Sequence, residues 1–569
     1  MAAVAATVVA GAAVVSGAAV VGVVVGAAVV AGVVEAAPEE ALDELEALFF
    51  DELQPAVTAT AARANAASRN RCVLGRNGRV VTPPRVPAAT AGVAPGRPVP
   101  PPPAADAPSC GFPLRAAVGS VTGVLDGWLD EVIAAHQRWT STWEPFAPHP
   151  STVLDEGRVA AALAELHERL EDNYPFFHPR YAGQMLKPPH PAAVAGYLAA
   201  LLINPNNHAL DGGPATAAME REVVAGLAEL FGFDPHLGHL TTSGTMANLE
   251  ALFVARESHP GRGVAFSVDA HYTHARMAAL LGLPAYPVAV DGTGRIDLEA
   301  VEPLVRAGRV GTVVLTAGTT GLGAVDAVDE ALALKQRYGV RLHVDAAYGG
   351  FYTLLAGAEL PAAPWRAVAA CDSVVVDPHK HGLQPYGCGA VLFADPAVGR
   401  FYRHDSPYTY FTSDELHLGE ISLECSRAGA AAAALWLTLR LLPLTADGLG
   451  AVLAPGWRAA QRWAELLDAT DGATLYQRPA LDIVTWFPTA DTFSAVDARA
   501  GAVLRDGMDS GRFFLSTLAV TADALGLRHP TVRADVGRGR ILRSVLMKPE
   551  AEDHLDRLHA DVMAAVRRH

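Results

Sequence analysis

The stretch VVVDPHKHGL, residues 374–383, ends an apolar, β-branched run with a lysine between two histidines. Such a run is typical of a buried strand. Lysine side chains are rarely buried without a partner, so Lys380 either extends its ammonium group to water or is held for chemistry. The other strand ends of the chain distinguish these two interpretations.

Similar apolar runs recur through the middle of the chain, separated by helical stretches such as MANLEALFVARES and VDEALALKQRYG. The runs occupy residues 264–268, 311–318, 341–347, 373–378 and 390–395. Continuous apolar strands that alternate with helices are typical of a mainly parallel sheet covered on both faces. The sequence therefore predicts an α/β fold with a doubly wound domain.

The sequence on either side of this domain has other patterns. Residues 116–202 carry apolar side chains at helical spacing and predict packing helices. The C-terminal part mixes helices with strands such as LDIVTWF and RILRSVLM, and predicts a smaller α+β domain. We expect a low-complexity segment at 1–34 and a Pro-rich, largely disordered linker at 35–115. A helical segment at 116–205, a large cofactor-binding domain at 206–439 and the small domain at 440–569 follow.

Composition excludes several classes of function. The chain has 569 residues, of which 44 are Lys or Arg and 60 are Asp or Glu, giving a formal net charge of -16. This charge repels phosphate backbones and anionic membranes, so we expect no nucleic-acid partner. The five cysteines lack CxxC spacing, which argues against a zinc site and for a reducing, cytoplasmic setting.

Residues 1–34 consist almost entirely of Ala, Val and Gly, with no charge before Glu35. The segment is long enough to span a bilayer, but it has no preceding basic residue and no aromatic residue. We therefore favour a low-complexity extension, disordered or loosely helical, over a membrane anchor. A mis-assigned start also stays open. Residues 82–108 are rich in proline and predict a polyproline II linker.

Ligands of open α/β sheets bind beyond the carboxyl ends of the strands. Four polar clusters follow apolar runs here: Ser243–Thr245, Thr319–Thr320, Asp345 with two alanines, and Lys380. Alone, each has an ordinary interpretation as a capped turn, a loop, a salt-bridge partner or a surface lysine. Together they suggest a phosphate cradle at a helix N-terminus, a hydroxyl group, a carboxylate beside a flat shelf, and an amine.

This combination matches pyridoxal 5'-phosphate (PLP). Lysine forms a Schiff base with the aldehyde of this cofactor, and a carboxylate keeps the pyridine nitrogen protonated, so that the ring acts as an electron sink. Because imine formation neutralises the amine, a buried position is useful rather than costly. We therefore expect Lys380 to be held for chemistry.

In order and spacing, the motifs TSGTMANL, DAHYTHARMAALLGL, AGTTGLGAVD, HVDAAYGG and DPHKH resemble the group II PLP-dependent amino-acid decarboxylases, which include aromatic amino-acid, glutamate, histidine and tyrosine decarboxylases. The resemblance covers residues 176–436, with a weaker echo near the C-terminus. It implies PLP fold type I, which is aspartate aminotransferase-like, with a mainly parallel seven-stranded sheet. It also implies release of CO2 and a primary amine from an L-amino acid, through an aldimine of Lys380 and a quinonoid intermediate.

The resemblance further implies roles for single residues at the ring. Lys380 would form the internal aldimine, and Asp345 would pair with the pyridine nitrogen. His271 would stack on the open face of the ring, and Ala347 would pack beneath it. The alternative for His271 is a surface imidazole in a polar turn.

At the phosphate end, the resemblance implies that Ser243, Gly244 and Thr245 bind the phosphate group and that His379 lies nearby. Thr320 would approach the phenolic oxygen of the ring. Together with the ring contacts, these residues form the expected cofactor site.

Two charged residues have an open role. Asp377 occupies a cofactor-binding position where many family members have asparagine, and its carboxylate must be protonated or bridged if it faces the phosphate. Arg427, in LECSRAG, would contact a phosphate or a substrate carboxylate, or form a structural ion pair, which is the commoner fate of such a residue.

In this family a tyrosine from a mobile loop is linked with protonation at Cα. RHDSPYTYFTSDELHLGE offers Tyr408 and Tyr410, each of which would alternatively pack within the loop or at a dimer contact. Because this loop often crosses to a partner subunit in this fold, the resemblance implies a homodimer.

Other functions and several substrates stay open. An aminotransferase or an aldehyde-releasing carbon-carbon lyase of the same fold would also carry Lys380, and only its product distinguishes it. A non-catalytic scaffold has no physical need for Lys380, Asp345 and His271 together. We expect an aromatic substrate, although INPNNHALDGGPATAAME also resembles subfamilies with acidic substrates. Four residues would suit an aromatic side chain or pack a subunit interface: Phe176, Phe177, His178 and Tyr181.

Overall fold

The computed structural model describes residues 10–15, 18–25, 28–34, 122–402 and 417–569. The chain forms two compact units, Met1–Phe112 and Pro113–His569. The predicted linker and the loop that contains Tyr408 and Tyr410 lie outside the described residues.

The smaller unit contains three strands, β1 (Ala10–Val15), β2 (Ala18–Val25) and β3 (Ala28–Val34). They pair antiparallel in the order β1-β2-β3. This differs from the disordered or loosely helical extension that we expect from the sequence. The physical reason is that valine, which is β-branched, favours extended backbone, and no charged residue interrupts the pairing.

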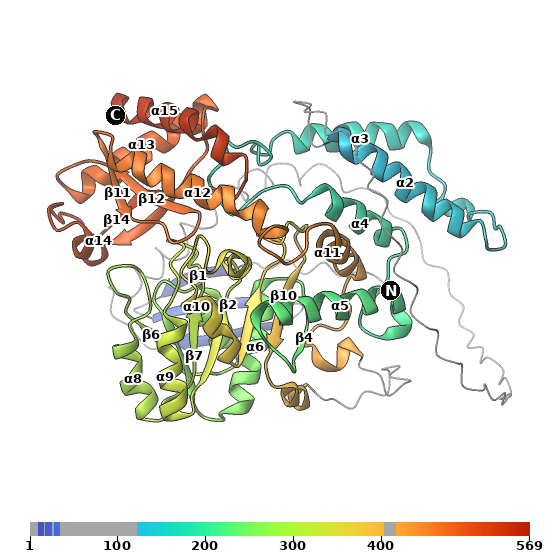
Figure 1. The fold of residues 1–569 in the computed structure, drawn as a ribbon, viewed down its shortest axis with the longest axis horizontal. Helices are drawn as coiled ribbons and strands as arrows, with labels where there is room; N and C mark the ends of the chain where they lie inside the picture. The colour runs from blue at the N-terminus through green and yellow to red at the C-terminus, as the bar shows by residue number, and fades with distance from the viewer. Residues whose placement is uncertain (1–9, 16–17, 26–27, 35–121, 403–416) are drawn as a thin grey trace. The chain divides into compact units, whose positions relative to one another are not determined.

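The larger unit is built around a seven-stranded sheet in the order β4-β10-β9-β8-β7-β5-β6 (Figure 1). Its strands are β4 (Leu237–Thr241), β5 (Gly263–Ser267), β6 (Ala285–Val288), β7 (Val310–Thr316), β8 (Arg341–Asp345), β9 (Ser373–Val376) and β10 (Gly389–Phe393). Strands β5 to β9 pair in parallel, which confirms the predicted mainly parallel sheet.

Strand β10 is antiparallel to both of its neighbours, although its apolar run resembles those of the parallel strands. The short connection from β9, residues 377–388, contains no helix, and a parallel pairing would need a long crossover. The sequence pattern also misses β4 and β6. Gly238 and His239 interrupt the apolar run of β4, and β6 is a partly exposed edge strand that contains Pro287.

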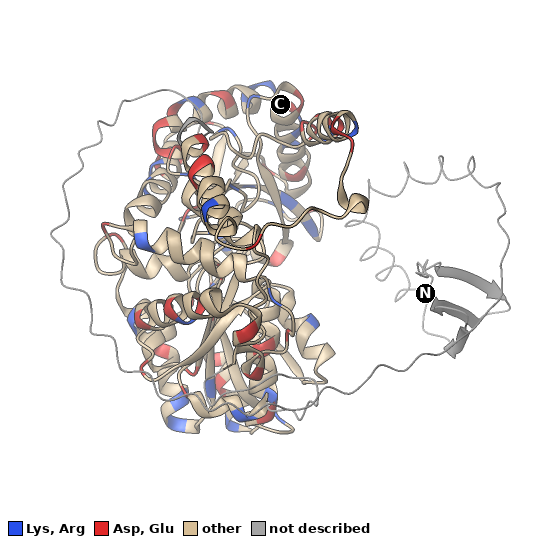
Figure 2. Ribbon diagram, turned by 90° about the vertical axis from the view of Figure 1, so that its right-hand side faces the viewer, with Lys and Arg blue, Asp and Glu red and all other residues tan. Residues whose placement is uncertain are grey.

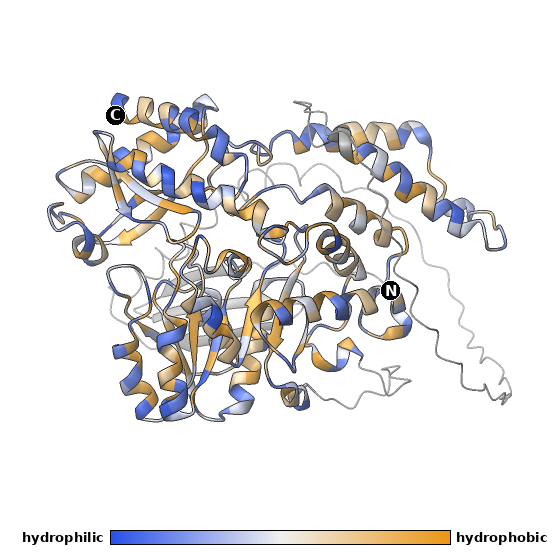
Figure 3. Cartoon of the chain, in the orientation of Figure 1, coloured by the Kyte–Doolittle hydropathy of each residue, from blue (hydrophilic) through white to orange (hydrophobic). Residues whose placement is uncertain are grey.

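Helices cover both faces of this sheet. α5 (Pro214–Phe231), α8 (Leu298–Arg306) and α9 (Val328–Tyr338) pack on one face, and α6 (Gly244–Ser258) and α7 (Thr273–Leu280) pack on the other. In β9, Val374 and Val376 face the first layer, whereas Val375 faces the second. The strands are therefore apolar on both sides. Figure 3 colours the chain by the hydropathy of each residue, and much of the sheet is orange.

A smaller antiparallel sheet, β11-β12-β14-β13, forms the C-terminal part and matches the predicted α+β domain. Helices α12, α13 and α15 enclose its core, which includes Trp463, Trp486 and Leu555. The elements are α12 (Leu449–Asp468), β11 (Ala473–Gln477), β12 (Ile483–Pro488), α13 (Phe493–Ser510), β13 (Ser516–Thr521), α14 (Ala522–Arg528), β14 (Arg538–Val545) and α15 (Ala551–Arg568).

The helices expected before the large sheet are present as α2 (Thr122–Thr140), α3 (Glu156–Leu170) and α4 (Pro191–Leu201). α4 packs closely on α11 (Gly429–Leu441), since a Cβ on Gly196 would lie 3.0 Å from the Cα of Ala434. α3 contains no buried residue. The prediction of packing helices therefore holds for α4, whereas α3 buries nothing against the described part of its own chain.

The remaining helices are short. They are α10 (Ala363–Ala367) and the 3-10 turns Pro150–Thr152, Leu210–Gly212, Gly350–Leu355, Val368–Ala370, Pro396–Phe401 and Leu418–Ile421. Charged side chains lie mainly on the outer helices and loops (Figure 2). Among the described residues, the helices are too short or too polar to cross a membrane.

Candidate active site

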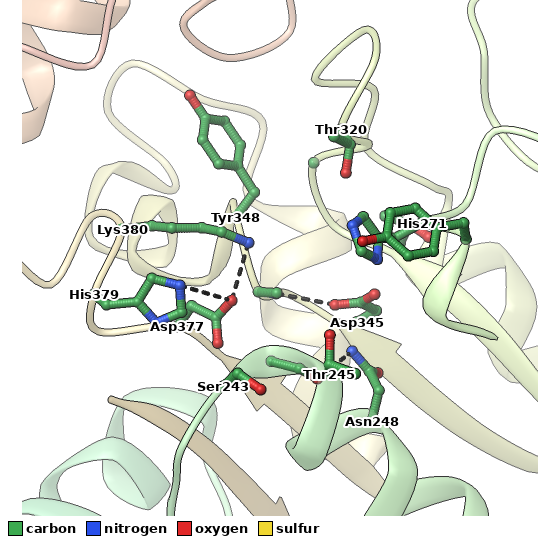
Figure 4. A pocket seen from close by; sticks show the side chains of 15 residues that line it. Ser243, Thr245, Asn248, His271, Thr320, Asp345, Tyr348, Asp377, His379 and Lys380 are labelled. Carbon is green, nitrogen blue, oxygen red and sulfur yellow. Dashed lines mark hydrogen bonds and ion pairs between the residues drawn. The ribbon is translucent and has the colours of Figure 1, made fainter. Parts of the chain in front are cut away.

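A pocket of about 240 Å³ lies at the carboxyl ends of the central strands. Figure 4 shows the side chains that face it. It brings together every predicted cofactor contact: Ser243, Gly244, Thr245, His271, Thr320, Asp345, Ala347, Asp377, His379 and Lys380. The sequence motifs that carry these residues are far apart along the chain, and the fold converges them on one cavity.

Lys380 stands in a tight turn just beyond the end of β9. Its backbone N–H donates to the carbonyl oxygen of Asp377, and the N–H of His379 donates to the carbonyl oxygen of Cys388. The Lys380 side chain reaches into the cavity (Figure 4), where Nζ lies 2.9 Å from Oδ2 of Asp377. The lysine of the opening stretch is thus held inside the protein by a carboxylate.

Asp345 is the last residue of β8, and its carboxylate is buried in the cavity wall. Nε2 of His274 donates to Oδ2 at 2.7 Å, and the N–H of Ala347 donates to Oδ1 at 3.1 Å. Burial by itself raises the pKa of Asp345, but the hydrogen bond from His274 and the neighbouring positive charges, that of Lys380 among them, together outweigh it and hold the pKa far below its usual range. Asp345 is therefore a fixed negative charge.

Asn248 connects the phosphate end to the sheet. It follows Gly244 by one helical turn in α6, and its Nδ2 donates to the carbonyl oxygen of Gly244 at 2.9 Å. Its Oδ1 lies 2.9 Å from Nε2 of His343, whose other ring nitrogen lies 2.9 Å from Oγ of Ser373. Burial lowers the pKa of His343 to about 3, so this ring is a neutral structural link.

The N-terminus of α6 forms the phosphate end of the pocket. Oγ of Ser243 accepts the N–H of Met246 and caps the helix, as the ordinary interpretation of this turn expects. The first N–H groups of a helix have no partner inside the helix and favour an anion. A Cβ at position 244 would lie 2.5 Å from Oδ2 of Asp377, so a larger residue there would displace this carboxylate.

Two histidines complete the wall. Nδ1 of His379 lies 2.8 Å from the carbonyl oxygen of Cys388, and Nε2 lies 3.6 Å from Oδ2 of Asp377. Burial lowers the pKa of both His379 and His271, with the charge of Lys380 acting in the same direction. His271 is therefore a neutral ring beside the cavity rather than a charged surface imidazole.

Sequence reasoning misses several residues of the wall, although most of them lie inside the quoted motifs. Asn248 is in TSGTMANL, His274 and Tyr272 are in DAHYTH, and Tyr348 is in HVDAAYGG. Helical spacing from Gly244 is a signal for Asn248. The missed residues that line the pocket are Asn248, Tyr272, Thr316, Gly318 and Tyr348.

The structure places Arg427, Phe176 and Phe177, whose roles the sequence leaves open. The guanidinium of Arg427 is buried and binds Oε1 of Glu220 at 2.5 Å and the carbonyl oxygen of Leu240 at 2.6 Å, so it forms a structural ion pair. Phe176 and Phe177 line a separate open groove of about 1190 Å³, not the pocket around Lys380.

These residues fit PLP. An ionised carboxylate suits a protonated pyridine nitrogen, a neutral imidazole suits the face of a flat ring, and a helix N-terminus suits a phosphate. Asp377 is the exception, because its Oδ1 is buried without a hydrogen-bond partner among the described residues. The pocket therefore suits PLP, and Asp377 is the one residue whose charge opposes the expected phosphate.

The chain is similar to several known proteins. A family model described as "Pyridoxal-dependent decarboxylase conserved domain" matches residues 175–486. Over 472 residues the chain is 28% identical to L-tyrosine decarboxylase of Enterococcus faecium, covering 63% of this chain and 77% of the relative. Over 266 residues it is 34% identical to a probable L-tyrosine/L-aspartate decarboxylase of Methanothermobacter thermautotrophicus, covering 46% and 70%. A crystal structure of mouse CSAD shares the fold, with a TM-score of 0.64 and 21% identity over 78% of this chain and 98% of that chain.

Proposed function

This chain belongs to the pyridoxal-dependent decarboxylase family and is a PLP-dependent amino-acid decarboxylase, and we propose that Lys380, Asp345 and His271 carry its reaction on an aromatic L-amino acid. When bound, PLP supplies the electron sink that accepts the electrons of the broken carbon–carboxylate bond. The observation that carries the proposal is one cavity with a lysine amine, an ionised carboxylate and a helix N-terminus.

Each of the three residues has a distinct task in this proposal. Lys380 would hold the cofactor through its amine. Asp345 holds a proton on the ring nitrogen, because its charge is fixed by His274. His271 covers one face of the ring and keeps water from it. Thr245 and Gly244 orient the phosphate through their position at the start of α6.

Arg543 is the residue that we propose for the substrate α-carboxylate. It lies in β14 with its guanidinium buried, and its Nε donates to the carbonyl oxygen of Gly321 at 3.2 Å, next to Thr320. Its Nη2 is buried and has no hydrogen-bond partner among the described residues. A buried charged donor without a partner is costly, and a carboxylate ligand would remove that cost.

An aromatic substrate is supported by the lining of the pocket. Tyr272 and Tyr348 line the cavity, and the hydroxyl of Tyr348 is bonded to Asp482. Within the described part of the chain Lys380 is the only Lys or Arg of this lining, and Arg543 lies outside it. An acidic side chain would need a second cation besides the one that binds the α-carboxylate. The similarity to an L-tyrosine decarboxylase points in the same direction.

The test is CO2 release by the purified full chain with PLP from L-tyrosine, L-phenylalanine, L-tryptophan, L-aspartate and L-glutamate. We expect an aromatic amino acid to react at least about tenfold faster than the acidic ones, which corresponds to a difference of about 1.4 kcal/mol. Lys380→Ala should abolish release, whereas Lys335→Ala, at an ion pair with Asp372 outside the pocket, should not. A keto acid or aldehyde product would contradict decarboxylation, and a preference for L-aspartate would contradict the aromatic assignment.

We also propose a homodimer in which α3 packs on a second copy of the chain. The apolar residues of α3 form one stripe at helical spacing, and all are exposed: Val159 38%, Leu163 48%, Leu166 49% and Leu170 55%. Exposed apolar surface of this kind marks an interaction site. Light scattering should give twice the chain mass, and Leu163→Glu with Leu166→Glu should shift it toward the monomer. Glu168→Ala, on the opposite side of α3, is the control.

The remaining expectations stay proposals. A cytoplasmic setting is supported by the free thiols of Cys371, Cys388 and Cys425. Protonation at Cα by Tyr408 or Tyr410 would be tested by comparing the Tyr→Phe variants for CO2 release and for aldehyde by-product. The division of the chain near residues 205 and 439 would be tested by limited proteolysis.

A further inference from the structure

We propose that Asp377 takes up a proton when the phosphate group of the cofactor binds, so that cofactor binding is coupled to proton uptake at this residue. The inference rests on the proposed function, because it requires PLP in the pocket. It concerns the one carboxylate at the phosphate end, whose surroundings differ from those of Asp345.

The position of Asp377 places a negative charge where an anion is expected. The residue follows β9 and is 2% exposed. Its carboxylate lies so close to the first residue of α6 that a Cβ on Gly244 would be 2.5 Å from Oδ2 and 2.8 Å from Oδ1. The helix N-terminus that suits the phosphate is therefore already occupied on one side by a carboxylate.

Lys380 is the counter-charge of Asp377 in the cofactor-free chain. Its Nζ lies 2.9 Å from Oδ2, whereas Oδ1 is buried without a hydrogen-bond partner among the described residues. The other titratable groups around the carboxylate are His379, His271, Asp345, Tyr386 and Cys388. Burial favours the neutral form of all of these. Only Asp345 stays ionised, because its partners lower its pKa, and it adds a second negative charge.

Attachment of the cofactor would change the nitrogen group with which Lys380 faces Asp377. The nitrogen of the Lys380 ammonium group forms a double bond to the aldehyde carbon, and the aldehyde oxygen leaves as water with two of the three ammonium hydrogens. The third hydrogen stays on the nitrogen, so the step by itself neither consumes nor releases a proton. The three donors of an ammonium group become a single N–H on a planar nitrogen. The nitrogen keeps its positive charge, but Asp377 then faces at most one donor in place of three as the phosphate arrives beside it.

A carboxylate next to a phosphate dianion in a buried site is driven toward its protonated form. The tautomer of His379 leaves one of its ring nitrogens without a hydrogen. Because a carbonyl oxygen only accepts hydrogen bonds, Nδ1 of His379 must carry the hydrogen that is donated to Cys388. Nε2 then has a lone pair, which lies 3.6 Å from Oδ2 of Asp377. At 3.6 Å this nitrogen is near Asp377 but beyond hydrogen-bond distance, so a proton on Asp377 would be donated to the phosphate oxygens.

The experiment is calorimetric titration of the cofactor-free full chain with PLP near pH 8, in two buffers with different heats of ionisation. The comparison uses the wild type, Asp377→Asn and the matched control Asp297→Asn, which keeps a good cap on α8. We expect the wild type and the control to take up about one proton per site more than Asp377→Asn, because any proton taken up on the ring nitrogen beside Asp345 is common to all three proteins. The Kd of the wild type should accordingly rise more steeply with pH above neutrality than that of Asp377→Asn.

The outcomes distinguish a failure of the proposed function from a failure of the proposal about Asp377. If the wild type binds no PLP and turns no yellow, the proposed function fails. If PLP binds and Asp377→Asn takes up as many protons as the wild type, the proton sits elsewhere and only the Asp377 inference fails. If Asp377→Asn does not fold, the infrared difference spectrum of the wild type decides. A new protonated-carboxyl band on addition of PLP supports the inference, and its absence overturns it.

Discussion

The two ends of the pocket each contain a buried carboxylate, and the two carboxylates are stabilised in different ways. Asp345 is held by His274 and by the N–H of Ala347, which both belong to the permanent frame of the protein. Asp377 is held by Lys380, the residue that reacts with the cofactor. The partners of Asp345 therefore stay in place when the cofactor binds, whereas the partner of Asp377 is the group that reacts.

This difference shows that burial alone does not decide the charge of a carboxyl group. Both carboxylates are almost fully buried, and burial opposes ionisation in both. The partners decide, and what matters is whether those partners remain during the reaction. The ring end needs a constant charge, and the phosphate end needs one that adapts to an incoming anion. Substitutions at the two ends of the pocket test this difference between Asp345 and Asp377.

The largest effect is expected from Asp345→Asn, which removes the permanent negative charge at the ring end of the pocket. The amide keeps the shape of the side chain but no longer stabilises a proton on the ring nitrogen, so the electron sink weakens. CO2 release should fall about a hundredfold or more, within the range of losses seen when a proton-holding group is removed. The Kd for PLP, measured by fluorescence quenching, should change far less. An equal loss in Asp297→Asn would show that the effect is not specific to the pocket.

A smaller effect is expected from His274→Leu, which removes the partner that fixes the charge of Asp345. CO2 release should fall about tenfold, the equivalent of one pKa unit, and His274→Gln should restore part of it because its amide can donate to Oδ2. Unchanged activity in His274→Leu would show that the N–H of Ala347 suffices to hold the charge.

The same variant has a signature in stability against pH. The pKa of Asp345 is lower in the folded chain than in the unfolded chain. Its contribution to the free energy of unfolding is therefore fully present above about pH 4 and is lost as the pH falls further. In His274→Leu the loss between pH 5 and pH 3 should be smaller by about 1 kcal/mol, measured by urea unfolding of the cofactor-free chain. An identical loss in both proteins would mean that His274 does not lower this pKa.

Much of the fold follows from local sequence patterns, because the parallel strands are apolar on both faces. The run SVVV in β9 shows this directly, with alternate valines in opposite helix layers. The direction of β10 does not follow from its own residues, since it depends on the length of the connection before it. The pairing of residues 10–34 as strands is also hidden, because small apolar residues are compatible with several backbone states.

The candidate site was predictable where a residue type has its chemistry at a strand end, as for Lys380 and Asp345. The partners that set the charge of those residues were not predictable. His274 lies in a helix and reaches across to β8, and His343 lies inside a strand where it looks like an interruption of an apolar run. Such contacts join segments far apart in the chain, and no local period encodes them.

Asn248 supports the phosphate end of the pocket, and its substitution tests that support. Asn248→Ala removes the donor to the carbonyl oxygen of Gly244 and leaves Nε2 of His343 unpaired, which costs about 1–3 kcal/mol of unfolding free energy. The Kd for PLP should rise about fivefold because the start of α6 is less firmly placed. The measurements are thermal unfolding and fluorescence titration with PLP. A lower melting temperature with unchanged Kd would show that Asn248 supports the sheet and not the cofactor.

The smallest effect is expected at Thr320, which lies at the rim of the pocket with an exposed side chain. Its hydroxyl would contribute one hydrogen bond to the ring oxygen, worth about 1 kcal/mol, so Thr320→Ala should weaken PLP binding about fivefold. Thr320→Ser keeps the hydroxyl and should bind PLP almost as the wild type does. Neither variant should alter the pH dependence of binding, because Thr320 has no charge and does not contact Asp377. If Thr320→Ala changed that dependence as strongly as Asp377→Asn, the two ends of the pocket would be coupled, and the constant and the adaptable carboxylate would not be independent.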